Sequence, residues 1–313
     1  MLSYTIRRIL MAIPTLWVAL TMIFILVRVI PGDPTTAVMG DYVTEKSMAV
    51  LKQQMGLDRP ILEQYGLYLF NFVRGDFGNS LITGLPVIKE LKNALPHTLE
   101  LTFFGLLLGT VTGIPLGILL ALKRNTFWDY VGRFLSLAGL SFPSFYIAVL
   151  LILFFSMKMD LLPVMGVGNA GNFWDRMHHL ILPSLTLGLL MMSYLTRMTR
   201  STMLDVLGSD YIRTAHAKGL KKIKVILKHA LKNASVSIVT VLGIYAGILI
   251  GSSVMTEIIF NRPGLGSLIV GSMLNRDYIT ITSIMTVYAA IVILINLLTD
   301  LSYGLIDPRI RYE

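Results

Sequence analysis

The sequence predicts an all-α polytopic membrane protein with six transmembrane helices, and three observations support this. Hydrophobic residues make up 54% of the 313 residues, charged residues make up only 14%, and the mean hydropathy is +0.70. Six uncharged runs are each long enough to cross about 30 Å of hydrocarbon as a helix. Lys and Arg also gather in alternate connections between these runs, as the positive-inside rule describes for membrane proteins.

The six uncharged runs cover residues 10–27, 101–122, 134–157, 180–196, 233–256 and 278–299. Lipid offers no partner for backbone N–H and C=O groups, so runs that cross it must be helical. The first run follows Arg7 and Arg8, as in a secretory signal, but it exceeds the usual length of a signal core. No cleavage site of the small-x-small type follows it, so we expect it to remain as the first span.

The charges predict the orientation. Sixteen of the 27 Lys and Arg, but only six of the 18 Asp and Glu, lie on the side that holds both termini. By the positive-inside rule both termini are cytoplasmic. The net charge of +9 is therefore explained by topology, and no nucleic-acid partner is expected.

The predicted organisation has three parts. Residues 1–30 form the cytoplasmic N-terminus and first span, residues 31–97 a large extracytoplasmic helical insertion, and residues 98–313 a five-helix core. Within the insertion, helix signals run from Thr44 to Gly56, from Pro60 onward and from Pro86 onward. Its acidic and basic residues nearly cancel, so it either docks a protein partner or caps the outer ends of the spans.

Glycine recurs at every fourth position in two of the runs. These residues are Gly105, Gly109, Gly113 and Gly117 in the second run, and Gly243, Gly247 and Gly251 in the fifth. Such a stripe allows another backbone to approach closely in lipid. The simpler interpretation is packing within the chain. For the fifth run, the alternative is contact with a second membrane subunit or with a path through the membrane. Pro115 and Pro143 predict kinks in the second and third spans.

The cytoplasmic loop of residues 197–232 contains two helix signals. Ser209 is placed to cap a short helix, Asp210 suits its positive end, and Gly219 is placed to end it in a left-handed turn. A second helix, with apolar residues on one face and lysines on the other, is expected to lie in the plane of the membrane surface.

Motifs for several kinds of chemistry are absent from the sequence. It has no phosphate-binding GxxxxGK[ST] loop, no HExxH and no GxSxG. His178 and His179 are adjacent and so lie on different helix faces, which disfavours a metal site. Arg28 and Glu257 sit at outer ends of spans, where their charges are expected to reach water by snorkelling. The sequence thus predicts no catalytic residue, no metal site and no resident cofactor.

The loop resembles a known family. Asp-Tyr-Ile-Arg-Thr-Ala-His-Ala-Lys-Gly-Leu from Asp210, followed by Lys-His-Ala-Leu-Lys-Asn-Ala from Lys228, resembles the EAA-type coupling loop of dipeptide and oligopeptide permeases of bacterial ABC importers. Further matching segments, in the same order along the chain, occur at residues 13–15, 30–34, 75–78, 263–266 and 306–311. The large first external loop is similar to that of the B-type subunit of such a permease pair. Two residues depart from the pattern: His216 replaces a usual arginine and Ser237 a frequent proline.

The resemblance implies a heterodimer of two permeases, two cytoplasmic subunits that bind ATP and Mg, and an extracytoplasmic solute-binding protein. The short helix would enter a groove of an ATPase subunit, with Ala215 and Ala217 as small residues at that contact. The residues assigned to this coupling are Ser209, Asp210, Tyr211, Arg213, Ala215, His216, Ala217 and Gly219. For the solute path, polar residues of the last span are expected: Thr280, Thr282, Ser283, Thr286 and Asn296.

The sequence leaves two questions open, the identity of the solute and the class of transporter. Relatives with the same architecture carry nickel or its chelates, glutathione or sugars, so the solute is open within the family. In a different class, an ion-driven secondary transporter would need intramembrane carboxylates or repeated halves, and neither is visible in the sequence.

Overall fold

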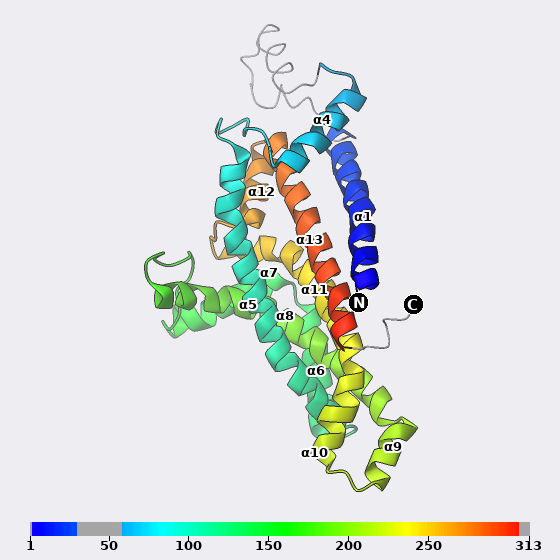
Figure 1. Cartoon of the computed structure of the whole chain (residues 1–313). Coiled ribbons are helices and arrows are strands. Elements are labelled where there is room, and N and C mark those ends of the chain that lie inside the picture. Colours follow the sequence, from blue (N-terminus) through cyan, green and yellow to red (C-terminus); the bar gives the residue numbers. More distant parts are fainter. Residues whose placement is uncertain (1, 30–57, 307–313) are drawn as a thin grey trace. The chain divides into compact units, whose positions relative to one another are not determined.

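The computed structural model describes residues 2–29 and 58–306. Most of these residues form helices (Figure 1), and the only β-pairing within the described ranges is an isolated bridge between Asn79 and Pro86. The predicted helix from Thr44 to Gly56 lies outside the described residues. The all-α polytopic class predicted from hydropathy is therefore confirmed.

The helices fall into two compact units. One comprises the described parts of Met1–Ile9, Thr98–Arg262 and Leu294–Glu313, and the other comprises those of Leu10–His97 and Pro263–Ile293. Helices α1, α5 and α13 contribute residues to both units. The loop of residues 197–232 lies in the first unit, and the loop that follows α4, together with α12, lies in the second.

Five helices of the described chain are long and apolar enough to cross a membrane, and a bent pair brings the number to six if it counts as one span. The long helices are α1 (Leu2–Val29), α5 (Val87–Leu122), α8 (Phe173–Leu207), α11 (Leu231–Ile259) and α13 (Tyr278–Ile306). The number agrees with the six runs predicted from the sequence.

The predicted third span is broken. Helix α6 (Phe127–Ser141) is followed by α7 (Ser144–Leu151) and the π-helical segment η1 (Ile152–Lys158), and the two parts meet at 104°. Phe142 and Pro143 between them have extended backbone, which the proline ring enforces on its predecessor. The sequence predicted a kink at this proline; the structure shows a full break.

Two helices in the segment after the first span agree with their predicted starts. Helix α4 (Ile61–Arg74) follows Pro60 and ends at Gly75, whose φ of 70° lies in the left-handed region. Helix α5 begins after Pro86, as predicted, but it continues into the second span as one helix of 36 residues. A short apolar helix, α12 (Leu265–Leu274), precedes α13.

Each unit has its own apolar core. In the first unit, buried residues of α5, α8 and α11, such as Leu101, Met191 and Ile238, pack together. In the second unit, Val87 and Leu91 of α5 pack with Leu265 of α12 and Ile284 of α13.

Candidate functional site

The loop of residues 197–232 forms the short helix predicted from its sequence. Helix α9 spans Asp210–Ala217, and Asp210 stands in its first turn. Gly219 has φ +71°, and its N–H donates to the carbonyl of His216 at 2.9 Å. Ser209 occupies the cap position with extended backbone, but its hydroxyl donates to the Val206 carbonyl instead of capping the helix. The helix and its glycine stop are as predicted, whereas the side-chain cap is not.

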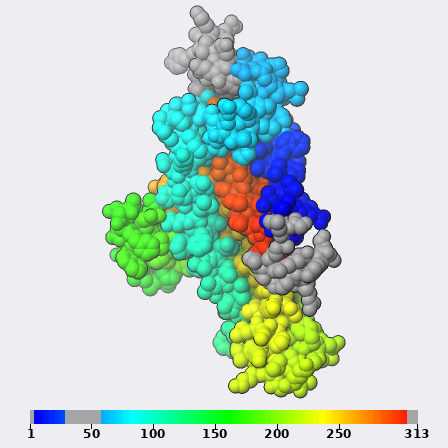
Figure 2. All heavy atoms as spheres, in the orientation of Figure 1, coloured from blue at the N-terminus to red at the C-terminus, as the bar shows by residue number. Residues whose placement is uncertain are grey.

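The two faces of α9 differ sharply. Ile212 and Ala215 are 2% and 6% exposed and belong to the apolar core of this unit. The side chains of Asp210 and Arg213 are 95% and 80% exposed. In Figure 2 the segment around α9, coloured yellow-green, lies open at the surface.

Ala215 therefore does not offer its side chain to a partner's groove, and the sequence-based expectation for it is wrong. The helical period brings this alanine to the same face as Ile212, three residues earlier, and that face packs on the chain itself. The open surface consists of other residues assigned to coupling, namely Asp210, Tyr211, Arg213, His216 and Ala217.

A hydrogen bond between side chains joins α9 to α11 (Leu231–Ile259). Nδ2 of Asn233, in α11, donates to the Tyr211 hydroxyl at 2.7 Å. The apolar face of α9 packs in the same core as Val225 and Ile226 of the π-helical segment η2 (Val225–Ala230). Helix α9 is thus joined to the segment that leads into α11 by both polar and apolar contacts.

The predicted in-plane lysine helix is not a separate element. Helix α10 (Lys222–Lys224), η2 and α11 follow one another without a break, and together they make one apolar span from Lys222 to Ile259. No glycine lies between Lys221 and Val241, and Ser237 stands where a proline would interrupt the helix. The chain therefore has no local signal that would separate an interfacial helix from the fifth span.

The glycine stripe of α5 packs within the chain. A Cβ built on Gly109 would lie 2.5 Å from Cβ of Met191 in α8, and one on Gly105 would lie 2.9 Å from Cβ of Leu187. Gly113 and Gly117 meet α8 in the same way, at Leu195 and Thr199. The interpretation of this stripe as an intramolecular helix contact is confirmed.

The stripe of α11 is divided between two environments. A Cβ on Gly243 would collide with Thr299 of α13, so this glycine also serves packing within the chain. A Cβ on Gly251 would meet nothing within 4 Å, and Gly247 is half-buried. Within this stripe, the end at Gly251 is therefore open to a neighbouring helix.

Three of the polar residues predicted for the solute path are buried in this chain. The Thr280 hydroxyl donates to Asp277, the Ser283 hydroxyl to the Ile279 carbonyl, and the Thr286 hydroxyl pairs with that of Tyr68. In this conformation their hydroxyls satisfy partners inside the chain. Asn296 is exposed, so its predicted role in solute passage stays open.

Glu257 is buried and does not reach water, which corrects the expectation of snorkelling. Its carboxylate accepts hydrogen bonds from Thr98 at 2.7 Å and from Ser253 at 3.0 Å. Beside it, Arg262 donates to Glu100, which also accepts from Arg176, each at 3.1 Å. Burial lowers the pKa of Arg262, while the carboxylates of Glu100 and Glu257 act to raise it.

These buried ionic contacts were not identified from the sequence. A second one joins α6 to α8, where Arg200 contacts Asp129, and the Asp129 carboxylate also accepts from the N–H of Asn125. The signal that points to such pairs is a lone acidic residue close to the end of an apolar run, but its partner follows only from the folding of the helices.

Metal-binding geometry is not present in the described part of the chain, where no cluster of three or more His, Asp or Glu side chains could hold an ion. The ring of His179 instead contacts the backbone carbonyl of Asp175, one turn earlier on α8.

The sequence matches two models of known protein families. Residues 113–312 match the family described as the binding-protein-dependent transport system inner membrane component, and residues 1–102 match the N-terminal model of the same transport systems. Together these two matches cover nearly the whole chain.

Curated relatives match over their full length. A dipeptide transport system permease protein from Alkalihalophilus pseudofirmus is 40% identical, with all of both chains covered. A glutathione transport system permease protein from Salmonella choleraesuis is also 40% identical over all of both chains, and that of Escherichia coli strain K12 is 39% identical.

A solved structure has a similar fold. The inward facing MetNI methionine ABC transporter matches 69% of this chain and 96% of its own with a TM-score of 0.56, at 20% sequence identity. The predicted resemblance to ABC importer permeases is thus confirmed by sequence and by fold. The chain belongs to the family of inner membrane components of binding-protein-dependent transport systems.

Proposed function

We propose that this chain and a second, homologous permease together form the path by which dipeptides and oligopeptides enter the cell. The observation that carries this proposal is full-length identity of 40% to both a dipeptide permease and a glutathione permease. Both named solutes are short peptides, because glutathione is a tripeptide. A peptide-type solute is therefore the chemistry that these relatives share.

ATP hydrolysis by separate subunits is coupled to this path through residues 209–219. The geometry of α9 supports this role, because Ile212 and Ala215 anchor it to the core while Asp210 and Arg213 project from the chain. The Tyr211 to Asn233 hydrogen bond then links the exposed helix to α11. A rigid lever of this kind can bias a bundle between two arrangements.

The complex requires further subunits. We assign to it two cytoplasmic ATP-binding subunits, which hold ATP and Mg, and an extracytoplasmic solute-binding protein. This chain holds no catalytic residue and no cofactor in that arrangement, and both of its termini face the cytoplasm. The split of Lys and Arg between the two sides supports that orientation.

Reconstitution tests the proposal directly. The complete complex, purified into proteoliposomes with its binding protein, should accumulate a labelled dipeptide in an ATP-dependent manner. This chain alone should neither hydrolyse ATP nor accumulate the peptide. Uptake of glutathione alone, of a nickel chelate or of a sugar would reassign the solute, and uptake driven by an ion gradient would overturn the ATP-coupled mechanism.

A further inference from the structure

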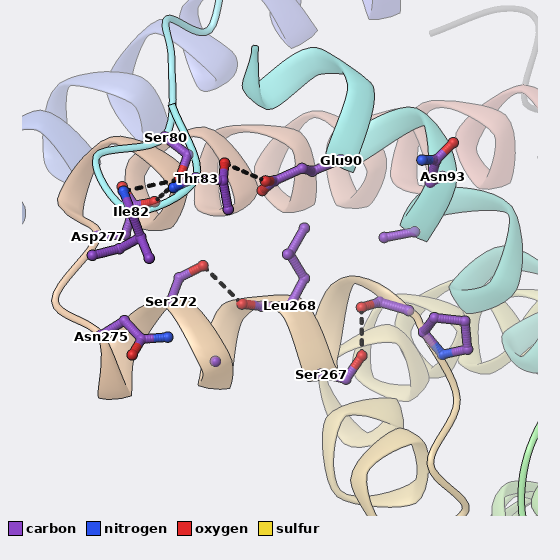
Figure 3. Close-up of a pocket in the computed structure, with 14 residues that line it drawn as sticks. Ser80, Ile82, Thr83, Glu90, Asn93, Ser267, Leu268, Ser272, Asn275 and Asp277 are labelled. Atoms are coloured by element: carbon purple, nitrogen blue, oxygen red, sulfur yellow. Dashed lines mark hydrogen bonds between the residues drawn. The ribbon is translucent and has the colours of Figure 1, made fainter. Parts of the chain in front are cut away.

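A cavity of about 480 Å³ lies in the unit that contains α4 and α12. Its walls are the loop around Ser80, the first turns of α5, and α12 (Figure 3). The α12 side chains that line it recur every three or four residues, so they form one face of that helix. The cavity is therefore built from three separate stretches of the chain.

Hydrogen bonds fix the shape of this cavity. Asp277 is 3% exposed, and its Oδ2 accepts from the hydroxyls of Ser80 at 2.6 Å and Thr280 at 2.7 Å. The Ser80 hydroxyl oxygen in turn accepts from the backbone N–H groups of Ile82 and Thr83. The loop is thus fastened to the start of α13, and the cavity is formed before any partner arrives.

The side chains that line the cavity carry negative charge and no positive charge. Two carboxylates, those of Glu90 and Asp277, belong to its wall, and none of the 14 residues that line it is Lys, Arg or His. The Asp277 carboxylate is held by three donors, whereas Glu90 accepts one hydrogen bond, from the Thr83 hydroxyl at 3.0 Å. Because a carboxylate has about four acceptor positions, Glu90 retains capacity for a cationic donor.

We propose that this cavity receives a lysine or arginine side chain of the extracytoplasmic solute-binding protein. The inference rests on the proposed function, which places this face outside the cell. Thr83, Asn93 and Asn275 are exposed members of the wall, so the cavity opens to the surface where such a protein would dock. A basic side chain would complement the two carboxylates and set the register of the complex.

The same charge pattern disfavours a free peptide as the occupant. A peptide solute carries an ammonium group and a carboxylate, and burial of an unpaired carboxylate is costly. The wall offers no cationic side chain to the peptide's carboxylate. A protein side chain brings the positive charge without the negative one.

Gly271 provides a variant that fills the cavity. It lines the cavity on α12, and a Cβ at this position would meet nothing within 4 Å, so a larger side chain displaces no neighbour at its base. Gly271→Trp should therefore block entry, and Gly271→Ala is the matched control that adds only a methyl group. Glu90→Gln removes the charge while its amide oxygen can still accept from Thr83.

The solute-binding protein is first identified as the one that stimulates ATP hydrolysis by the wild-type complex. The measurement is then the dissociation constant between this purified protein and the complex in nanodiscs. We expect Gly271→Trp to weaken binding on the order of tenfold, Glu90→Gln to weaken it about fivefold and flatten its salt dependence, and Gly271→Ala to leave it within about twofold.

Unchanged affinity in both Gly271→Trp and Glu90→Gln would overturn the docking proposal. Unchanged affinity with lost peptide uptake in Gly271→Trp would also overturn it, because the cavity would then serve the solute. In either case, ATP-driven peptide uptake by the wild-type complex would still support the proposed function. A wild-type complex without ATP-driven uptake would count against the proposed function itself.

Discussion

Asp129 and Arg200 form a bidentate ion pair between α6 and α8. Nε of Arg200 lies 2.6 Å from Oδ1 of Asp129, and Nη2 lies 2.8 Å from Oδ2. The Asp129 side chain has no exposed surface, and that of Arg200 is 16% exposed. The pair thus joins α6, the first half of the broken third span, to α8, the helix that precedes α9.

Removal of one partner should destabilise the chain strongly. Arg200→Ala leaves a buried carboxylate without its cation, and we expect a loss of about 3 kcal/mol in the free energy of unfolding. The double variant Asp129→Asn with Arg200→Gln, which removes both charges, should recover part of that loss. Denaturant unfolding in detergent measures both values.

Arg133→Gln is the control for this pair. Arg133 lies 3.9 Å from the same carboxylate, but its side chain is 42% exposed, so its loss should cost below about 1 kcal/mol. A cost as large as that of Arg200→Ala would show that the bidentate geometry is not what stabilises Asp129.

The two glycine stripes should respond differently to the same substitution. Gly109→Leu forces α5 away from Met191, and we expect a loss of about 2 kcal/mol or more together with reduced yield of folded protein. Gly251→Leu enters open space, so the isolated chain should keep its stability. If Gly251→Leu lowers the yield of the assembled complex, measured by copurification of the second permease, this position contacts that partner. Equal loss of chain stability in both variants would contradict the packing shown here.

Gly219 should tolerate asparagine but not valine. Its φ of +71° suits glycine, is accessible to asparagine, and costs a β-branched residue on the order of 1–2 kcal/mol. No neighbouring atom lies within 4 Å of a built Cβ, so the penalty comes from the backbone alone. We expect Gly219→Val to reduce solute-stimulated ATP hydrolysis and uptake while Gly219→Asn retains both. Equal activity of the two variants would show that this turn does not position α9.

Substitutions on the two faces of α9 should have different effects, one on folding and the other on coupling to the ATPase subunits. Ala215→Glu places a charge in the core of the chain, and we expect loss of folded permease in size-exclusion chromatography. Arg213→Glu alters an exposed side chain, so the permease should fold normally but retain less of the ATPase subunits on copurification. Normal copurification and uptake with Arg213→Glu would remove this face from the ATPase contact.

The orientation can be tested with introduced cysteines, because the chain has none of its own. Asn79 and Lys222 are both exposed, and the charge distribution places them on opposite sides of the membrane. In right-side-out vesicles an impermeant maleimide should label Asn79→Cys and spare Lys222→Cys. Labelling of Lys222→Cys before permeabilisation would reverse the proposed topology.

Much of the fold follows from local signals. Pro60 precedes the first residue of α4, and Gly219 ends α9 in a left-handed turn. In the glycine stripe of α5, the period of four residues by itself indicated a close helix contact. These features depend on residues near one another in the chain, so one sequence was sufficient to predict them.

Other features depend on which helices meet. The sequence predicted α9 as a short helix but not that Ala215 faces inward, because its apolar neighbours Val225 and Ile226 lie beyond the turn. Glu257 was predicted to reach water, but its partner Thr98 lies 159 residues away along the chain. In the same way Asp129 and Arg200 are separated by 71 residues and form a pair only when α6 packs on α8.

The sequence by itself determined the membrane class, the number of apolar runs, the short helix α9 with its glycine stop, and the family. Periodicity, backbone preference and charge distribution are local or additive properties, which a single chain displays without folding. Only the tertiary structure decided which side of α9 is free, which glycines already have a neighbour, and how the buried charges are paired. These outcomes depend on burial and on pairs of atoms from distant segments, and such pairs exist only once the helices have packed.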